Sequence, residues 1–445
     1  MSEAAGKSAT VQLRIEKPIY GGAGLARADG KAVFVPFTLP GEHVEARIAD
    51  DRGGYANAEI ETVLDPSPAR VPAPCPYFGA CGGCHYQHAA YAAQVEMKLA
   101  ILRESLERAH IREIPEIATL TAEPFGYRNR IRLHVQRTPF ALCYKRRNSH
   151  ANLPIAGCPI AALQLQEAVA ALTAEGANLG LSAWVGELEL FMNPDASSLL
   201  LSLWTERPPR EAQRLLAELW PRLQSLLPGL TGAAAFASGK CRHAGQLVAQ
   251  FGENSLRYSA AARNYRVSLG SFFQVNRFLL DALVEHVTGG TGGEHAWDLY
   301  AGVGLFSLPL AEKFVAVTAV ESSAPSVGDL RENLRSAGRD ATHRVIAAET
   351  AAFLQRTVEQ RLPAPDLVVV DPPRAGLGRD VTTFLGNIRA PRITYVSCDP
   401  ATLGRDLAAL LETGYSLRHM HLVDLFPQTF HLESITHLAL DSVAD

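Results

Sequence analysis

Apolar and polar residues alternate between residues 9 and 65 as in short β-strands. An Asp29-Gly30 pair, typical of a tight hairpin turn, separates two of the alternating segments. The apolar members of the pattern are Val11, Leu13, Ile15, Val33, Val35, Val44, Ala46 and Ile48. The pattern predicts a small antiparallel β-barrel of OB-like size, a fold that often binds RNA or oligosaccharide. A purely structural β-module is the alternative.

The pattern changes twice further along the chain. Prolines 66, 68, 72 and 74 predict a stiff linker. Between residues 89 and 109, Val95, Leu99, Leu102 and Leu106 share one face at helical spacing, which predicts a helix. Residues 112–265 mix both periodicities, and no order of elements can be read from them.

From about residue 266, short apolar runs alternate with helical stretches. The runs are Ala296–Ala301, Val315–Val320, Leu367–Val370 and Ile393–Ser397. This alternation is typical of βαβ units and a parallel sheet. We therefore predict a multidomain α/β chain with an N-terminal β-barrel (1–67), a central mixed α/β domain (68–265) and a C-terminal Rossmann-like domain (266–445).

Composition supports this division and narrows the setting. A chain of 445 residues is too long for one core. No apolar run reaches the length of a membrane span, and the first residues lack a signal-peptide pattern, so a cytoplasmic protein is expected. In that reducing compartment the seven cysteines are not expected to form disulfides. The net charge of −4 gives no global sign of nucleic-acid binding.

One stretch is locally cationic. No acidic residue occurs between Glu123 and Glu167. The basic residues in this interval include Arg128, Arg130, Arg132, Arg137, Lys145, Arg146 and Arg147. Such a strip suits a phosphate backbone, and a solvated strand face is the alternative.

Two polar motifs follow neighbouring apolar runs. Cys398 ends the run at 393–397, and Asp371 begins an Asp-Pro-Pro-Arg motif after the run at 367–370. The carboxyl ends of such strands face one crevice, where open α/β sheets bind ligands. A thiol and a carboxylate are therefore expected to meet there, although a buried cysteine can also be simple packing.

A glycine turn after the run at 296–301 predicts a nucleoside cofactor. Gly302 and Gly304 permit a tight strand-to-helix turn, and Glu321 lies where an acid accepts hydrogen bonds from ribose hydroxyls. The third glycine of the dinucleotide fingerprint is absent. S-adenosylmethionine therefore fits better than NAD. An exposed helix-capping acid is the alternative for Glu321.

The thiol selects among the methyl-transfer reactions. Asp-Pro-Pro is shared with enzymes that methylate exocyclic amines, but these usually carry an aromatic residue where this chain has Arg374, and an amine needs no thiolate. Carbon 5 of uracil becomes nucleophilic only when a thiolate adds to C6, and a base must later remove the C5 proton. Glu433 is the candidate base.

These residues resemble the RumA/TrmA-type RNA 5-methyluridine methyltransferases over nearly the full chain. The matching segments are the barrel (a TRAM domain in that family), Cys75-x5-Cys81-Gly82-Gly83-Cys84, and the motifs at 272–276, 299–304, 371–374, 397–400 and 431–433. The resemblance implies a class I methyltransferase domain, with Cys398 as nucleophile and Glu433 as base. It also implies cofactor contacts from Gln274, Tyr300, Gly302, Gly304, Glu321 and Asp371, with Asp371 also near the target base, which one of Phe272 and Phe273 would stack on after it is flipped out.

Cys75, Cys81, Cys84 and Cys158 form a further candidate site. Four thiolates suit zinc or an iron–sulfur cluster, and reduced unligated thiols are the alternative. The resemblance implies a [4Fe–4S] cluster with Cys158 as the fourth ligand, in a structural or RNA-shaping role. Cys143 and Cys241 have no assigned partner and are expected to be packing residues.

The sequence thus predicts a cytoplasmic, monomeric enzyme that makes 5-methyluridine in RNA, with 23S ribosomal RNA favoured. Methylation of a transfer-RNA loop is the near alternative. Two others are a catalytically idle RNA-binding protein that kept the fold and an exocyclic-amine methyltransferase.

Overall fold

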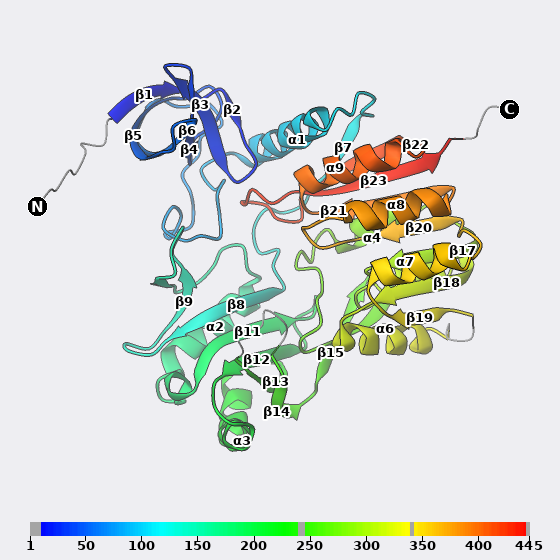
Figure 1. The fold of residues 1–445 in the computed structure, drawn as a ribbon. Helices are drawn as coiled ribbons and strands as arrows, with labels where there is room; N and C mark the ends of the chain where they lie inside the picture. Colours follow the sequence, from blue (N-terminus) through cyan, green and yellow to red (C-terminus); the bar gives the residue numbers. More distant parts are fainter. Residues whose placement is uncertain (1–9, 239–244, 339–341, 442–445) are drawn as a thin grey trace, which may run out of the picture.

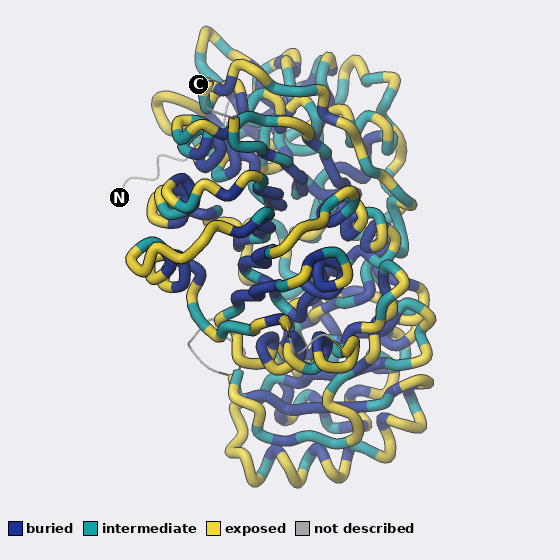
Figure 2. Tube along the Cα trace, turned by 90° about the vertical axis from the view of Figure 1, so that its right-hand side faces the viewer, coloured by how far each residue is buried: buried dark blue, intermediate teal, exposed yellow. Residues whose placement is uncertain are grey.

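The computed structural model describes residues 10–238, 245–338 and 342–441. Figure 1 shows a small β-domain at one corner, a central sheet with its helices, and a larger layered α/β unit that contains the C-terminus. Buried segments run through the interior of the molecule, and exposed segments concentrate at its outer edges (Figure 2).

The N-terminal β-domain is a six-stranded sheet in the order β1-β5-β6-β4-β3-β2. Its pairs are antiparallel except β4 with β6. Leu13, Val33, Val35 and Val44 fill its core, which confirms the period-two pattern. The strands are β1 (Thr10–Arg14), β2 (Lys17–Pro18), β3 (Ala23–Ala28), β4 (Lys31–Pro36), β5 (His43–Asp51) and β6 (Tyr55–Asp65).

The C-terminal unit is built on an eight-stranded sheet in the order β19-β18-β17-β20-β21-β23-β22-β7. The four runs predicted as parallel strands are β17 (Gly293–Leu299), β18 (Phe314–Glu321), β20 (Leu367–Val370) and β21 (Arg392–Ser397), and they are parallel as expected. The remaining strands are β7 (Ile117–Leu120), β19 (Arg344–Ala347), β22 (Tyr415–Val423) and β23 (Glu433–Leu440), and β23 lies antiparallel to β21 and β22.

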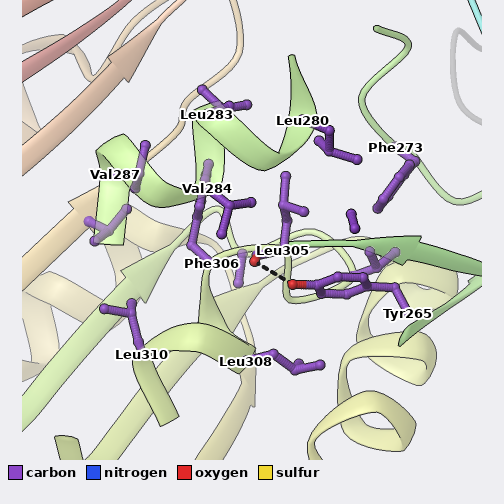
Figure 3. Packing of buried hydrophobic residues seen from close by; sticks show 14 of the residues in the cluster. Tyr265, Phe273, Leu280, Leu283, Val284, Val287, Leu305, Phe306, Leu308 and Leu310 are labelled. Atoms are coloured by element: carbon purple, nitrogen blue, oxygen red, sulfur yellow. Dashed lines mark hydrogen bonds between the residues drawn. The ribbon is translucent and has the colours of Figure 1, made fainter. Parts of the chain in front are cut away.

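Helices cover both faces of this sheet. One buried cluster joins it to α1 (Tyr91–Arg108), α7 (Thr350–Glu359), α8 (Gly378–Ile388) and α9 (Pro400–Leu411). A second cluster joins the opposite face to α4 (Leu280–Thr288), α5 (Ser307–Ala311) and α6 (Ala324–Ser336). Figure 3 shows α4 presenting Leu280, Leu283, Val284 and Val287 to this second cluster, beside Tyr265, whose hydroxyl donates to the Leu305 carbonyl (3.1 Å).

Residues 91–120 belong physically to the C-terminal sheet although they precede the central region in sequence. The predicted helix near 89–109 is α1, which packs on α9, and β7 pairs parallel with β22. A segment far from the C-terminus in sequence therefore forms one edge of the sheet. The three domain boundaries given above stay predictions.

The central region holds a seven-stranded sheet in the order β10-β9-β8-β11-β12-β13-β14, with its own buried core. Its elements are β8 (Arg130–Gln136), β9 (Ala141–Lys145), β10 (Asn152–Pro154), α2 (Leu163–Glu175), the short 3-10 helix η1 (Leu181–Ala183), β11 (Val185–Met192), β12 (Leu199–Thr205), α3 (Pro209–Leu226), β13 (Leu230–Ala237) and β14 (Leu247–Gly252). The hairpin of β15 (Ser255–Ala260) and β16 (Arg263–Ser268) leads into the C-terminal unit.

Within the described residues, every helix is too short or too polar to cross a lipid bilayer.

Candidate active site

Three predicted residues lie at adjoining strand ends. Asp371 directly follows β20 and Cys398 directly follows β21, while Glu433 is the first residue of β23. Ser397 pairs with Ser434 in the antiparallel β21–β23 ladder, so the next position along β21 places Cys398 opposite Glu433. Residues opposite one another in such a ladder have Cα atoms about 5 Å apart. The thiol and the carboxyl are thus neighbours by register.

The groups that shift the pKa of Cys398 also show that Glu433 and Asp371 lie close to it. Burial, and then the negative charges of Glu433 and Asp371, raise the pKa of the Cys398 thiol to about 12, while the Arg374 guanidinium opposes the shift. Cys398 also lies directly before Asp399, the N-cap of α9, and the N-terminus of that helix favours a thiolate. Burial beside two carboxyls outweighs both cationic influences, so the thiol of the ligand-free protein is protonated at neutral pH.

The carboxyls share this environment. Burial and then the charge of Asp371 raise the pKa of Glu433 well above its usual value, and Arg374 opposes the shift. Burial and then Asp298 raise the pKa of Asp371 to about 7. A carboxyl with a raised pKa is a stronger base, which suits removal of a proton from carbon.

The glycine turn after β17 contacts Glu321. Tyr300, Gly302 and Gly304 have φ angles of 63°, 55° and 92°, so the chain turns tightly after β17. The Gly302 backbone N–H donates to Oε2 of Glu321 (2.9 Å), at the end of β18. A cavity of about 610 Å³ begins at the next residue and is lined by Ser322, Ser323 and Glu349 among others. Glu321 and the glycine turn do not line it, so the cofactor contacts stay a prediction.

The two adjacent phenylalanines differ in exposure. Phe273 is buried and packs against Tyr258, at a ring separation of 4.6 Å. Phe272 is 65% exposed. Only Phe272 therefore has a free face for a base. Gln274 is buried, and its backbone carbonyl accepts a hydrogen bond from Asn129 (3.1 Å).

Tyr20 is a residue of this site that sequence reasoning missed. It lies in the turn between β2 and β3, and its hydroxyl donates to the backbone carbonyl of Cys398 (3.4 Å). Its ring meets Phe430 edge-on at 5.4 Å. The separation of 378 residues from Cys398 left no local signal that could have indicated the contact.

The predicted cationic strip is neutralised in part by the neighbouring strand. Arg130 faces Glu189 (3.7 Å) and Arg132 forms an ion pair with Glu187 (2.5 Å), both acids lying on β11. Arg132 also stacks 3.8 Å above the Trp204 ring centre. Arg128 instead lines a cavity with the cysteines. RNA contacts by these arginines stay a prediction.

The four cysteines of the proposed cluster line one cavity of about 340 Å³. All four are free thiols: Cys75, Cys81, Cys84 and Cys158. Arg128 and Tyr144 line the same cavity. Among the described residues, no three His, Cys, Asp or Glu side chains converge closely enough to hold one metal ion. The expectation of a ready-formed metal site is therefore not met. Four thiols that line one cavity are a donor set suited to either zinc or an iron–sulfur cluster. Buried Cys143 is a packing residue as expected, and Cys241 lies outside the described residues.

Comparison with protein families gives two matches. Residues 242–440 match the family model described as tRNA (Uracil-5-)-methyltransferase, and residues 7–60 match the TRAM domain. The first match contains the glycine turn, Asp371, Cys398 and Glu433, and the second covers most of the N-terminal sheet.

Curated relatives extend the likeness over the whole chain. An uncharacterized RNA methyltransferase of Aquifex aeolicus is 33% identical over 439 residues, covering 97% of this chain and 99% of the relative. The 23S rRNA (uracil(1939)-C(5))-methyltransferase RlmD of Halomonas elongata is 32% identical, covering 98% of this chain and 90% of the relative.

A solved structure shows the same fold. The tRNA (uracil-54, C5)-methyltransferase of Pyrococcus abyssi, in complex with S-adenosyl-L-homocysteine, superposes with a TM-score of 0.77 at 23% identity, covering 96% of this chain and 100% of that one. The chain belongs to the S-adenosylmethionine-dependent RNA (uracil-5-)-methyltransferase family and carries that family's catalytic domain behind an N-terminal TRAM domain.

Proposed function

We propose that this protein methylates C5 of one uridine class in 23S ribosomal RNA through a covalent adduct between Cys398 and C6 of the base. The observation that carries the proposal is the β21–β23 register, which sets Cys398 opposite Glu433 with Asp371 at the adjoining strand end. A packing cysteine has no need of two buried carboxyls and a guanidinium around it. The same group argues against an idle RNA-binding protein.

In the proposed reaction the Cys398 thiol passes its proton to the neighbouring Asp371 carboxylate, the thiolate forms a bond to C6, and the electrons of the C5=C6 double bond move to C5 and O4. S-adenosylmethionine supplies a methyl group on positively charged sulfur. C5 forms a bond to that methyl carbon as the sulfur–carbon bond breaks. Glu433 then removes the C5 proton, the double bond reforms, and the thiolate leaves C6. Asp371 holds the base, and exposed Phe272 stacks on the uracil after it leaves its helix or loop.

The proposed cofactor residues have separate tasks. Glu321 accepts hydrogen bonds from the ribose hydroxyls, and the backbone turn at Gly302 and Gly304 lets the nucleoside approach closely. Tyr300 and Gln274 also contact the cofactor in this proposal. An exocyclic-amine methyltransferase would need none of the chemistry at Cys398.

The role of Glu433 as the base that removes the C5 proton is tested with Glu433→Gln. The variant should accumulate the covalent protein–RNA adduct and release methylated RNA slowly, because the methylated adduct cannot lose its C5 proton. Denaturing gels and intact mass spectrometry follow the adduct. Glu412→Gln, at the end of α9 and away from the site, is the matched control. Release at the wild-type rate by Glu433→Gln would remove this glutamate as the base.

The RNA class is tested by supplying labelled methyl donor with either unmodified 23S ribosomal RNA or unmodified transfer RNA. The name of the Halomonas elongata relative supports ribosomal RNA. Methylation of 23S RNA alone is expected, with 5-methyluridine located by mass mapping. Methylation of transfer RNA alone would contradict the ribosomal assignment and leave the C5 chemistry intact.

We further propose that Cys75, Cys81, Cys84 and Cys158 hold a [4Fe–4S] cluster. The shared cavity supports this, as does the partial exposure of all four thiols, whereas the dedicated packing residue Cys143 is fully buried. When bound, the cluster supplies a rigid cross-link between residues 75–84 and 158. Iron and sulfide analysis of anaerobically purified protein should give about four of each per chain. One equivalent of zinc would overturn the choice.

The same proposal places the enzyme in the cytoplasm as a monomer that works on RNA. Its size in solution, with and without RNA, checks the monomer directly.

A further inference from the structure

A second cavity, of about 580 Å³, lies on the face of the C-terminal sheet that α4 covers in part. Its walls come from the last turn of α4 and from β21, β22 and β23. Arg392 begins β21 and Cys398 follows its end, so the two sites are separated by about 20 Å of strand. We call this hollow the histidine cavity, defined by His286, His419, His421, His437, Arg392 and Arg418.

The register of the sheet gathers the histidines. His437 of β23 lies between Thr394 of β21 and His419 of β22, opposite each of them. His421 follows two residues later on β22, and its ring lies 4.8 Å from that of His286 on α4. Four of the 14 histidines therefore share one small region, built from three strands and a helix.

The cavity has more unused donor capacity than acceptor capacity. Arg392 donates only to backbone carbonyls, those of Gly292 (3.0 Å) and Asp366 (3.4 Å), and no carboxylate among the described residues forms an ion pair with it. Nδ1 of His421 is buried and has no hydrogen-bond partner within the described part of the chain. A buried polar atom of this kind calls for a ligand or a water.

The other charges facing the cavity are few. Glu285 is the one carboxylate on the wall among the described residues, and Asp441 is engaged by Arg418 (2.8 Å). With one guanidinium free of carboxylates and one buried imidazole nitrogen without a partner among the described residues, an anion fits better than a cation.

We propose that the histidine cavity binds a phosphate group, either of an RNA backbone or of a free nucleotide. Arg392 meets two phosphate oxygens with its planar fork, and His437, His419 and His421 donate to the remaining ones. This site goes beyond the proposed methyl transfer, since none of its residues belongs to the catalytic group. Only the case in which the phosphate belongs to an RNA backbone rests on the proposed function.

The histidines determine the direction in which phosphate affinity changes with pH. Burial and the neighbouring imidazoles lower the pKa of His437 to about 4, and burial, His286 and His419 lower the pKa of His421. These rings are therefore neutral in the empty protein and take up protons when an anion arrives. Phosphate binding should strengthen as pH falls. A metal ion would compete with those protons and bind more tightly as pH rises.

Calorimetric titration of the full chain with inorganic phosphate, AMP and a uridine-free RNA oligonucleotide tests the proposal. Phosphate should bind up to about a hundredfold more tightly near pH 6 than near pH 8, for uptake of about one proton per phosphate. Arg392→Gln and the exposed His419→Gln should each weaken it about tenfold. His110→Asn, at an exposed histidine after α1, is the control and should leave binding unchanged.

Comparison of the three titrants distinguishes the two sources of phosphate. If the oligonucleotide competes with phosphate, and both variants weaken that competition, the site contacts an RNA backbone. If only phosphate and AMP bind, the site takes a free nucleotide. Unaltered phosphate affinity in both variants would overturn the site. So would absence of phosphate binding by the wild type, or variant-sensitive binding of Zn²⁺ that strengthens with pH. Slow release of methylated RNA by Glu433→Gln with phosphate binding intact separates this site from the catalytic one.

Discussion

At the scale of single residues, the decisive feature is a buried thiol with a raised pKa. Burial, with the charges of Glu433 and Asp371, raises the pKa of Cys398 to about 12, although the N-terminus of α9 lies close by. In the proposed mechanism this thiol becomes a nucleophile once RNA and the methyl donor are bound.

This state of Cys398 predicts a distinctive alkylation profile in the free protein. Because the thiolate fraction grows tenfold per pH unit below the thiol pKa, the rate with iodoacetamide should rise about tenfold for each unit between roughly pH 7 and pH 9. Mass spectrometry of the peptide that contains Cys398 gives the rate. A rate that levels off by about pH 9 would show an ordinary or depressed thiol pKa and contradict the environment described.

Asp298 predicts how stability depends on pH. Burial raises its pKa to about 7, and Ser307 donates a hydrogen bond to it. The folded state favours the protonated form, so this contribution to stability is complete below about pH 4 and is lost as pH rises to about 7. Asp298→Asn, which mimics the protonated form, should lose less stability than the wild type over that interval.

Urea unfolding at about pH 4 and about pH 8 measures this difference. Asp380→Asn, at an exposed position on α8, is the control and should follow the wild type. Equal pH dependence in Asp298→Asn and wild type would show that Asp298 ionises normally in the fold.

Residue-scale prediction from sequence worked where a residue follows a recognisable strand. Cys398 and Asp371 follow the neighbouring parallel strands β21 and β20, so the order of those strands was enough to bring them together. Glu433 begins the antiparallel strand β23, which periodicity did not indicate. Nor did the sequence indicate the acids that pair with Arg130 and Arg132, because they come from β11 and strand pairing in that region has no sequence signature.

At the scale of elements, α1 holds the loop that leads to Glu433. Lys98 forms a fully buried ion pair with Asp424 and donates to the Phe426 carbonyl (2.9 Å). Gln94 exchanges hydrogen bonds with Gln428 at 3.0 Å in both directions. The loop 424–432 is therefore fixed by a helix more than 300 residues earlier in the chain.

Lys98→Met is expected to destabilise the protein by about 3–5 kcal/mol, because it leaves Asp424 buried without its partner. Lys98→Met combined with Asp424→Leu should recover most of that loss. Denaturant unfolding measures both. Lys17→Met, which removes the partly exposed pair with Glu104, should cost no more than about 1 kcal/mol. A Lys98→Met effect as small as that of Lys17→Met would contradict the burial of the pair.

The hairpin of the TRAM domain reaches the catalytic loop through Tyr20. Tyr20→Ala removes the contacts with Phe430 and with the carbonyl of Cys398, so it should lower kcat about tenfold and leave KM for RNA nearly unchanged. Tyr55→Ala, at an exposed barrel position, is the control. An increase in KM with kcat preserved would assign Tyr20 to RNA binding instead of positioning.

At the scale of the whole molecule, the chain joins a TRAM domain, a central sheet with a cysteine-lined cavity and a methyltransferase sheet (Figure 1). Periodicity predicted the first and third units, because period-two alternation and βαβ order are local. It could not assign α1 and β7 to the C-terminal sheet, since β7 pairs with a strand about 300 residues later. Nor could it reveal the histidine cavity, whose residues meet only through strand register.

The central claim is that Cys398 adds to the pyrimidine ring, and RNA carrying 5-fluorouridine tests it most directly. Fluorine at C5 cannot be removed as a proton, so the methylated adduct should be trapped. With S-adenosylmethionine, intact mass spectrometry should show protein, RNA and one methyl group joined, with the link at Cys398. Cys143→Ala should form this adduct, and Cys398→Ala should not. No adduct in the wild type, or an equal adduct in Cys398→Ala, would contradict the mechanism.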